Sequence, residues 1–100
     1  MTAPKVDLTT RLTVPARVLF RELAGEAVLL QTESGLYFGL DEIGTRIWSL
    51  LQQHGQVGRV YEQMLEEYAV SPERLHEDLL QLITTLTSRG LLEIQDREVP

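Results

Sequence analysis

The chain has 100 residues, 43% of them hydrophobic, which is enough for one domain with a single modest core. It contains no cysteine, which excludes disulfides and thiolate metal sites, and no apolar run is typical of a signal peptide or a membrane span, so we expect a cytoplasmic protein. The formal net charge of −6, with only nine Lys and Arg residues, argues against binding to nucleic acid or anionic membranes, because that binding depends on basic side chains.

The N-terminal residues are polar and mixed and include two prolines. We expect residues 1–15 to be a flexible arm, with contacts to the domain at Leu12 and Val14. One domain then follows over residues 16–95, with a short tail over residues 96–100.

Three strand-like runs come first in the domain. Residues 18–22 are β-branched and aromatic, residues 27–31 form a short apolar run, and residues 36–40 alternate between two faces. Short glycine-containing turns separate the runs. The simplest arrangement is a three-stranded antiparallel meander.

Three helices are expected after the strands. Asp41 can cap the first helix, which ends at His54, and a second apolar periodicity covers residues 57–68. The third helix begins after Ser71, a good capping residue, and ends at Gly90, which can adopt the left-handed closing conformation. The predicted fold class is therefore α+β, a three-stranded antiparallel sheet followed by three helices in a winged helix-turn-helix-like arrangement.

Residues that could support catalysis are few and scattered. His54 and His76 lack the spacing of a metal-binding pair. The serines have no glycine-flanked nucleophile context, and the glycines do not form a phosphate loop. We therefore expect no enzyme activity, no metal and no cofactor.

Residues 20–23, 26–30 and 34–48 resemble the PqqD-like family, named after the D protein of pyrroloquinoline quinone biosynthesis. The resemblance extends over residues 14–94 and is most specific between residues 35 and 48. The second helix lacks the Ser or Thr start that is usual in the family. The junction between the third strand and the first helix is more similar to the broad group, which includes stand-alone lasso-peptide adaptors, than to PqqD proper.

The resemblance implies a RiPP recognition element, where RiPP denotes a ribosomally made, post-translationally modified peptide. Such a domain binds the leader of a precursor peptide as an added strand on its third strand, with leader side chains in a groove beside the third helix. The implied function is that of a non-catalytic adaptor. The implied partners are the precursor peptide and a modifying enzyme, such as a radical SAM maturase or a leader peptidase.

The third strand would be an edge of the meander, with unpaired backbone groups that an incoming strand can satisfy. The predicted peptide-binding residues on this strand are Leu36, Tyr37, Phe38, Gly39 and Leu40. The missing side chain of Gly39 would ease the approach of a second chain, or it could simply permit a bend before the first helix.

The third helix carries two apolar stripes. The core stripe is predicted to centre on Leu79, Leu82 and Leu86. The predicted peptide-binding flank has i, i+4, i+7, i+11 spacing and contains His76, Leu80, Ile83 and Thr87. We expect Leu80 and Ile83 to line a pocket with Tyr37 on its opposite wall, although a wide core could instead bury Leu80 against the first helix.

Two other functions use the same elements. A winged-helix DNA-binding protein would present basic or amide side chains on its third helix, but this helix is acidic between Arg74 and Arg89. A structural oligomer would pair the edge strand with its own copy, which makes a homodimer a further hypothesis.

Overall fold

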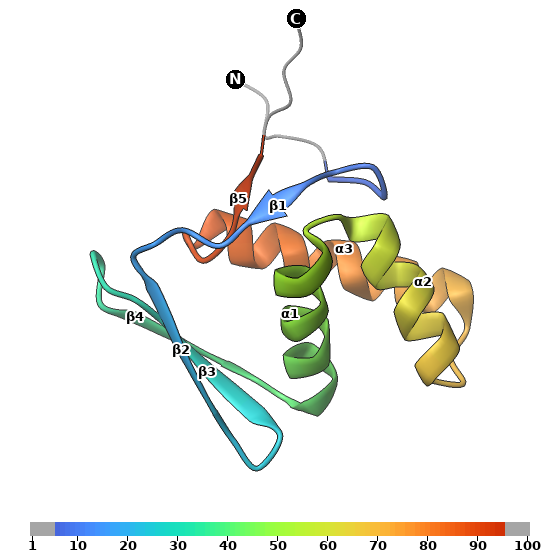
Figure 1. Ribbon diagram of the computed structural model, residues 1–100, viewed down its shortest axis with the longest axis horizontal. Coiled ribbons are helices and arrows are strands. Elements are labelled where there is room, and N and C mark those ends of the chain that lie inside the picture. Colours follow the sequence, from blue (N-terminus) through green and yellow to red (C-terminus); the bar gives the residue numbers. More distant parts are fainter. Residues whose placement is uncertain (1–5, 96–100) are drawn as a thin grey trace, which may run out of the picture.

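The computed structural model describes residues 6–95, and Figure 1 shows the arrangement of the elements. In chain order the elements are β1 (Leu12–Thr13), β2 (Val18–Leu23), β3 (Glu26–Gln31), β4 (Leu36–Leu40), α1 (Glu42–His54), α2 (Val57–Glu67), α3 (Pro72–Ser88) and β5 (Glu93–Ile94). Strands β2, β3 and β4 form an antiparallel sheet in that order, and the three helices follow. The predicted α+β fold is therefore confirmed. A separate antiparallel pair of β1 with β5 was not predicted.

The helices cover one face of the β2–β3–β4 sheet and leave the other face open (Figure 1). Strand β3 shows this by alternation, since Ala27 and Leu29 are buried while Val28 between them is exposed. Trp48 of α1 lies under the sheet at 1% exposure, and the Phe20 ring meets it edge-on with ring centroids 6.2 Å apart. The sheet face and α1 therefore share the core.

Polar contacts join the end of β4 to the start of α1. Asp41 caps the helix, as expected, because its carboxylate accepts a hydrogen bond from Gly44 N at 2.8 Å. The buried Thr45 hydroxyl accepts from Ala27 N at 2.8 Å and donates to Leu40 O at 3.4 Å. These contacts fix the angle between the sheet and α1.

The expected contacts of Leu12 and Val14 with the domain are confirmed, but residues 6–15 of the expected arm also form structure that a flexible arm does not predict. Leu12 is 4% exposed and belongs to the core, and its N–H donates to Gly55 O at 2.8 Å. Strand β1, which includes Leu12, pairs with β5 near the other end of the domain. Residues 1–5 of the expected arm and the expected tail over residues 96–100 lie outside the described residues.

The N-terminal segment also supplies the start of α2. The N–H groups of Val57 and Gly58 donate to the carbonyl oxygens of Thr10 and Leu8, at 3.1 and 2.8 Å. Gln56, at the capping position, makes no side-chain cap hydrogen bond. The first free N–H groups of α2 are therefore satisfied by backbone from another segment, which explains the absence of a Ser or Thr start.

Helix α3 begins where the sequence predicts, with Ser71 Oγ accepting from Arg74 N at 3.3 Å. Its buried stripe, however, is Leu75, Leu79, Ile83 and Leu86. Ile83 is 0% exposed, whereas Leu82 is only partly buried, so the expected centre of the stripe is corrected by one residue. Leu82 and Ile83 both fit a helical apolar period, and only the packing of α3 decides which of them faces the core.

Within residues 6–95, no helix combines the length and the apolar character that crossing a membrane would need.

Candidate functional site

The hydrogen bonds of the sheet show which backbone groups are free at its edge. A central strand bonds alternately to its two neighbours. Thr32 N donates to Arg17 O at 2.9 Å, which continues the register of the β2–β3 pair. The even-numbered residues of β3 therefore direct their backbone groups to β2, and the odd-numbered ones direct theirs to β4.

Strand β4 is the last strand of the sheet and has one open edge. The residues opposite the odd-numbered positions of β3 are Leu36, Phe38 and Leu40. The intervening residues, Tyr37 and Gly39, consequently point their backbone N–H and C=O groups away from the sheet. They form a short row of donors and acceptors that an added strand could pair with.

A groove with a volume of about 560 Å³ runs beside this edge. It is lined by the end of β4, the first turns of α1 and one flank of α3, through Phe38, Gly39, Leu40, Asp41, Ile43, Gly44, Ile47, Asp78 and Leu82. The volume exceeds that of a single side chain and falls in the range of small ligand sites. Ile43 is 42% exposed at this groove, so its apolar side chain is available to a bound chain.

The groove has apolar walls and two acidic side chains. Leu82 and Ile47 supply apolar surface, and Asp41 and Asp78 also line it. The Arg89 guanidinium stands 5.6 Å from the centroid of the Phe38 ring. An apolar side chain can enter this groove without displacing a buried polar group.

The predicted residues of β4 all lie on the edge strand, but they face two ways. Phe38, Gly39 and Leu40 line the groove. Tyr37 is 69% exposed and lies on the open outer face of the sheet. Leu36 is partly buried on the inner face and packs against the core.

The residues predicted on α3 do not line the groove. The His76 ring contacts Tyr61 of α2 with centroids 5.9 Å apart, and Thr87 lies in a hollow with Val6 of the N-terminal segment. Leu80 is partly buried against the core. Ile83 is fully buried, and the hollow that Tyr37 lines does not include Leu80.

The groove instead receives the opposite flank of α3. Asp78 and Leu82 lie at spacing i, i+4, so they share one side of the helix. The sequence offers the same helical spacing for both flanks, and it therefore could not distinguish them. No sequence signal singles out Ile43 in this groove, because it lies four residues before Ile47 on one apolar stripe of α1 and only the structure shows that it is exposed.

The family described as "Coenzyme PQQ synthesis protein D (PqqD)" matches residues 26–92, which include the edge strand and the whole groove. A solved structure described as "TbiB1 in Complex with the TbiA(beta) Leader Peptide" superposes with a TM-score of 0.77 at 32% sequence identity, covering 84% of this chain and 98% of that one. No curated protein matched significantly. The chain belongs to the PqqD family.

Proposed function

We propose that this chain is a non-catalytic adaptor that binds the leader segment of a ribosomally made precursor peptide and presents it to a modifying enzyme. The open edge of β4 beside an apolar groove is the observation that carries the proposal. The similar TbiB1 structure, which was solved with a leader peptide, supports it.

The geometry defines how a leader would bind. A guest strand running antiparallel to β4 exchanges backbone hydrogen bonds with Tyr37 and Gly39. Residues directly opposite each other point to the same face of a sheet. Guest residues opposite Phe38 and Leu40 therefore point into the groove, while the residue between them points to the outer face.

The expected affinity follows from the size of the site. Burial of one leucine-sized side chain contributes roughly 1.5–3 kcal/mol, and each backbone hydrogen bond adds a net contribution of about 0.5–1.5 kcal/mol. Two groove side chains and the pairs at Tyr37 and Gly39 contribute several kcal/mol before the cost of ordering a short peptide is subtracted. A modest affinity, micromolar or weaker, is the expected result.

In this role the partner enzyme carries out every chemical change to the precursor peptide, and this chain only binds it. Within residues 6–95, no three His, Asp or Glu side chains are grouped as a metal site would require. When the chain alone is incubated with precursor peptide, the mass of the peptide should stay unchanged. A mass change that requires only this chain would contradict the adaptor role.

Amide chemical shifts test the binding mode. The titrants are synthetic leaders, among them the TbiA(beta) leader bound in the similar TbiB1 structure, and a scrambled peptide of the same composition is the control for each. Shifts should concentrate on residues 36–40, on Ile43 and on the Leu82 flank of α3. Shifts confined to α2, or identical shifts with the scrambled peptide, would refute the proposal.

A further inference from the structure

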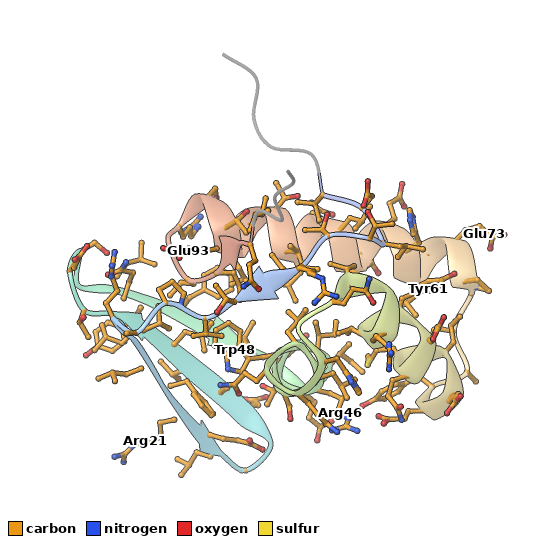
Figure 2. All side chains as sticks on the ribbon, turned by 45° about the horizontal axis from the view of Figure 1, so that its top comes forward. Arg21, Arg46, Trp48, Tyr61, Glu73 and Glu93 are labelled. Carbon is orange, nitrogen blue, oxygen red and sulfur yellow. The ribbon has the colours of Figure 1, made fainter. Side chains whose placement is uncertain are left out.

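The outer face of the β2–β3–β4 sheet is apolar and uncovered within the described part of the chain. Leu19, Val28 and Tyr37 are 57%, 46% and 69% exposed on it, and they line a hollow of about 410 Å³ together with Leu30. Figure 2 shows that Arg21, on this face of β2, points away from the helices. A cluster of exposed apolar side chains on a small protein indicates a surface that binds another molecule.

Two cross-strand rows cross all three strands on this face, beside a shorter row that pairs Leu23 with Glu26. One row runs from Leu19 through Leu30 to Tyr37 and is continuous. The other runs from Arg21 through Val28 and ends at Gly39, which has no side chain. The face therefore has a gap beside the open edge, bordered by Val28 and Tyr37.

The backbone does not require glycine at position 39. The described residues with positive φ are Ala24 and four glycines, Gly25, Gly35, Gly55 and Gly90. A Cβ built on Gly39 would meet nothing within 4 Å. Neither the backbone conformation nor crowding by this chain's own atoms explains why residue 39 is a glycine. Its missing side chain leaves an empty space on the outer face of the sheet.

We infer that this gap is a second subsite for the leader, and this inference rests on the proposed function. The guest residue that pairs with Gly39 exchanges both backbone hydrogen bonds with it and points its side chain to the outer face. That side chain lies across the gap, between Val28 and Tyr37. The subsite takes an aromatic side chain.

The distances favour an aromatic ring. Neighbouring strands are about 4.8 Å apart, so a side chain must cross one empty strand position to reach Val28. Tyr37 is the diagonal neighbour of the guest residue, at about 7–8 Å, which aromatic side chains can span. A leader that fits both faces is an extended tripeptide with an aromatic residue between two apolar residues.

A second copy of the chain is the less suitable occupant of this face. Arg21 lies in the row of Val28 and has no ion pair within residues 6–95. Glu26 lies on the same face, so charge alone does not exclude a symmetric pair of copies. The gap beside the open edge of β4, where a guest strand pairs, is what favours the leader as occupant.

The test uses the synthetic leader that shifts the β4 amides. Its residue opposite Gly39, located by nuclear Overhauser contacts to the Gly39 α-protons, is changed to alanine. Calorimetric titration should show about tenfold weaker binding, as expected for loss of one buried ring. Gly39→Leu, which keeps the N–H but fills the gap, should weaken the aromatic peptide about tenfold and leave binding of the alanine peptide unchanged or stronger.

Two substitutions on the outer face complete the test. Val28→Ser should weaken the aromatic peptide several-fold, whereas Leu19→Ser, on the same face but two strands from the gap, should not. Equal effects of these two variants, or no effect of Gly39→Leu on a peptide that still shifts β4, would overturn the subsite and leave the proposed function intact. Absence of β4 shifts with every peptide would instead overturn the proposed function.

Discussion

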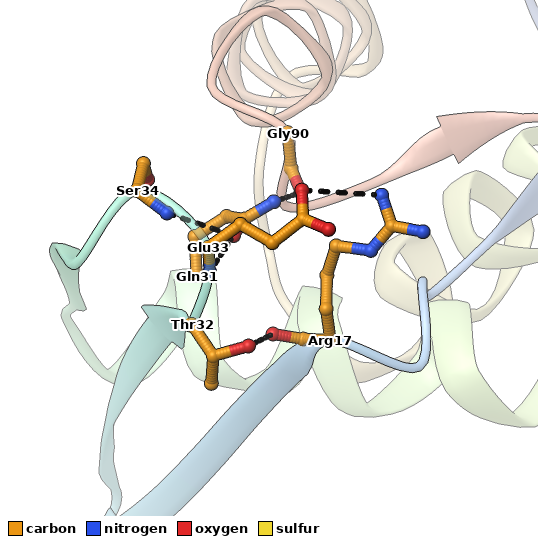
Figure 3. A network of polar contacts seen from close by, with 6 residues as sticks. All are labelled: Arg17, Gln31, Thr32, Glu33, Ser34 and Gly90. Atoms are coloured by element: carbon orange, nitrogen blue, oxygen red, sulfur yellow. Dashed lines mark hydrogen bonds and ion pairs between the residues drawn. The ribbon is translucent and has the colours of Figure 1, made fainter.

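Gln31 and Gly90, 59 positions apart in the sequence, are joined by a hydrogen bond from Gln31 Nε2 to the Gly90 carbonyl oxygen at 3.3 Å (Figure 3). The same side chain accepts a bond from Glu33 N at 2.7 Å through its Oε1 atom. One buried amide thus ties the β3–β4 turn to the end of α3. Because β4 and α3 form the two walls of the groove, this contact holds one end of the groove at a fixed width.

We predict that Gln31→Leu lowers the free energy of unfolding by about 1–3 kcal/mol. The leucine leaves the Gly90 carbonyl and the Glu33 N–H without their partner, and unsatisfied groups in a partly buried site are costly. Urea denaturation measures the change. Thr32→Val is the control in the same network, since its exposed hydroxyl donates to Arg17 O and water can replace that bond. Equal losses in the two variants would contradict the assigned role of Gln31.

The edge strand was predictable because its signals are local. The glycine-containing turns, the alternation over residues 36–40 and the capping Asp41 each indicate the turn, strand or helix start in which they occur. The helical half of the groove was not predictable in this way. The choice between Leu82 and Leu80 as its lining depends on how α3 rotates over the core, and periodicity carries no information on that rotation.

The contacts between the N-terminal segment and α2 were not predictable for a related reason. The polar composition of this segment predicts an exposed arm, but its carbonyl groups are the partners that α2 needs at its start. The close approach of the N-terminal segment requires a glycine at position 58, because a Cβ there would lie 2.9 Å from Leu8 O. A weak helix start that contains glycine can therefore mark a site where another segment provides the cap.

A surface ion pair gives a pH-dependent prediction. The Arg46 guanidinium donates to both carboxylate oxygens of Glu67, joining α1 to α2, and with a further bond from Gln63 it lowers the pKa of Glu67 to about 2 from an ordinary 4.5. A lowered pKa means that the pair stabilises the fold fully above pH 4.5 and loses its effect as the pH falls through about 2.

Thermal melting of the Glu67→Gln variant tests this. The variant should melt below the unmodified chain by a constant margin above pH 4.5, and the margin should shrink toward pH 2. Glu66→Gln is the matched control, because Glu66 makes no ion pair within the described residues. A margin that stays constant down to pH 2 would show that Glu67 acts through packing alone.

The groove wall of α3 gives a binding prediction. Leu82→Asp should weaken leader binding at least about tenfold, because it puts a carboxylate in an apolar groove that already contains Asp41 and Asp78. Calorimetric titration measures the loss, and a melting curve of the same variant checks the fold. Gln81→Asp adds the same charge one residue away, on an exposed position outside the groove, and should leave binding unchanged. Similar losses in both variants would show that net charge, and not the groove, controls affinity.

The two edges of the sheet provide a matched pair for the strand-addition mechanism. Gly39 directs its N–H to the open edge of β4, and by the same alternation Glu22 directs its N–H to the open edge of β2. Proline at either position removes an N–H that makes no bond within the sheet, and proline is tolerated at such edge positions. The two substitutions should therefore lower the melting temperature by similar small amounts.

Their effects on peptide binding should differ. Gly39→Pro removes a donor that the guest strand uses and adds a ring at the contact, so binding of the synthetic leader should fall by more than about tenfold. Glu22→Pro alters the edge that has no groove beside it, and affinity should stay within about twofold of the unmodified chain, a difference of about 0.4 kcal/mol. If both variants bind normally, the leader does not pair with β4. If both lose binding equally, the peptide depends on the sheet as a whole, and the edge of β4 has no special role.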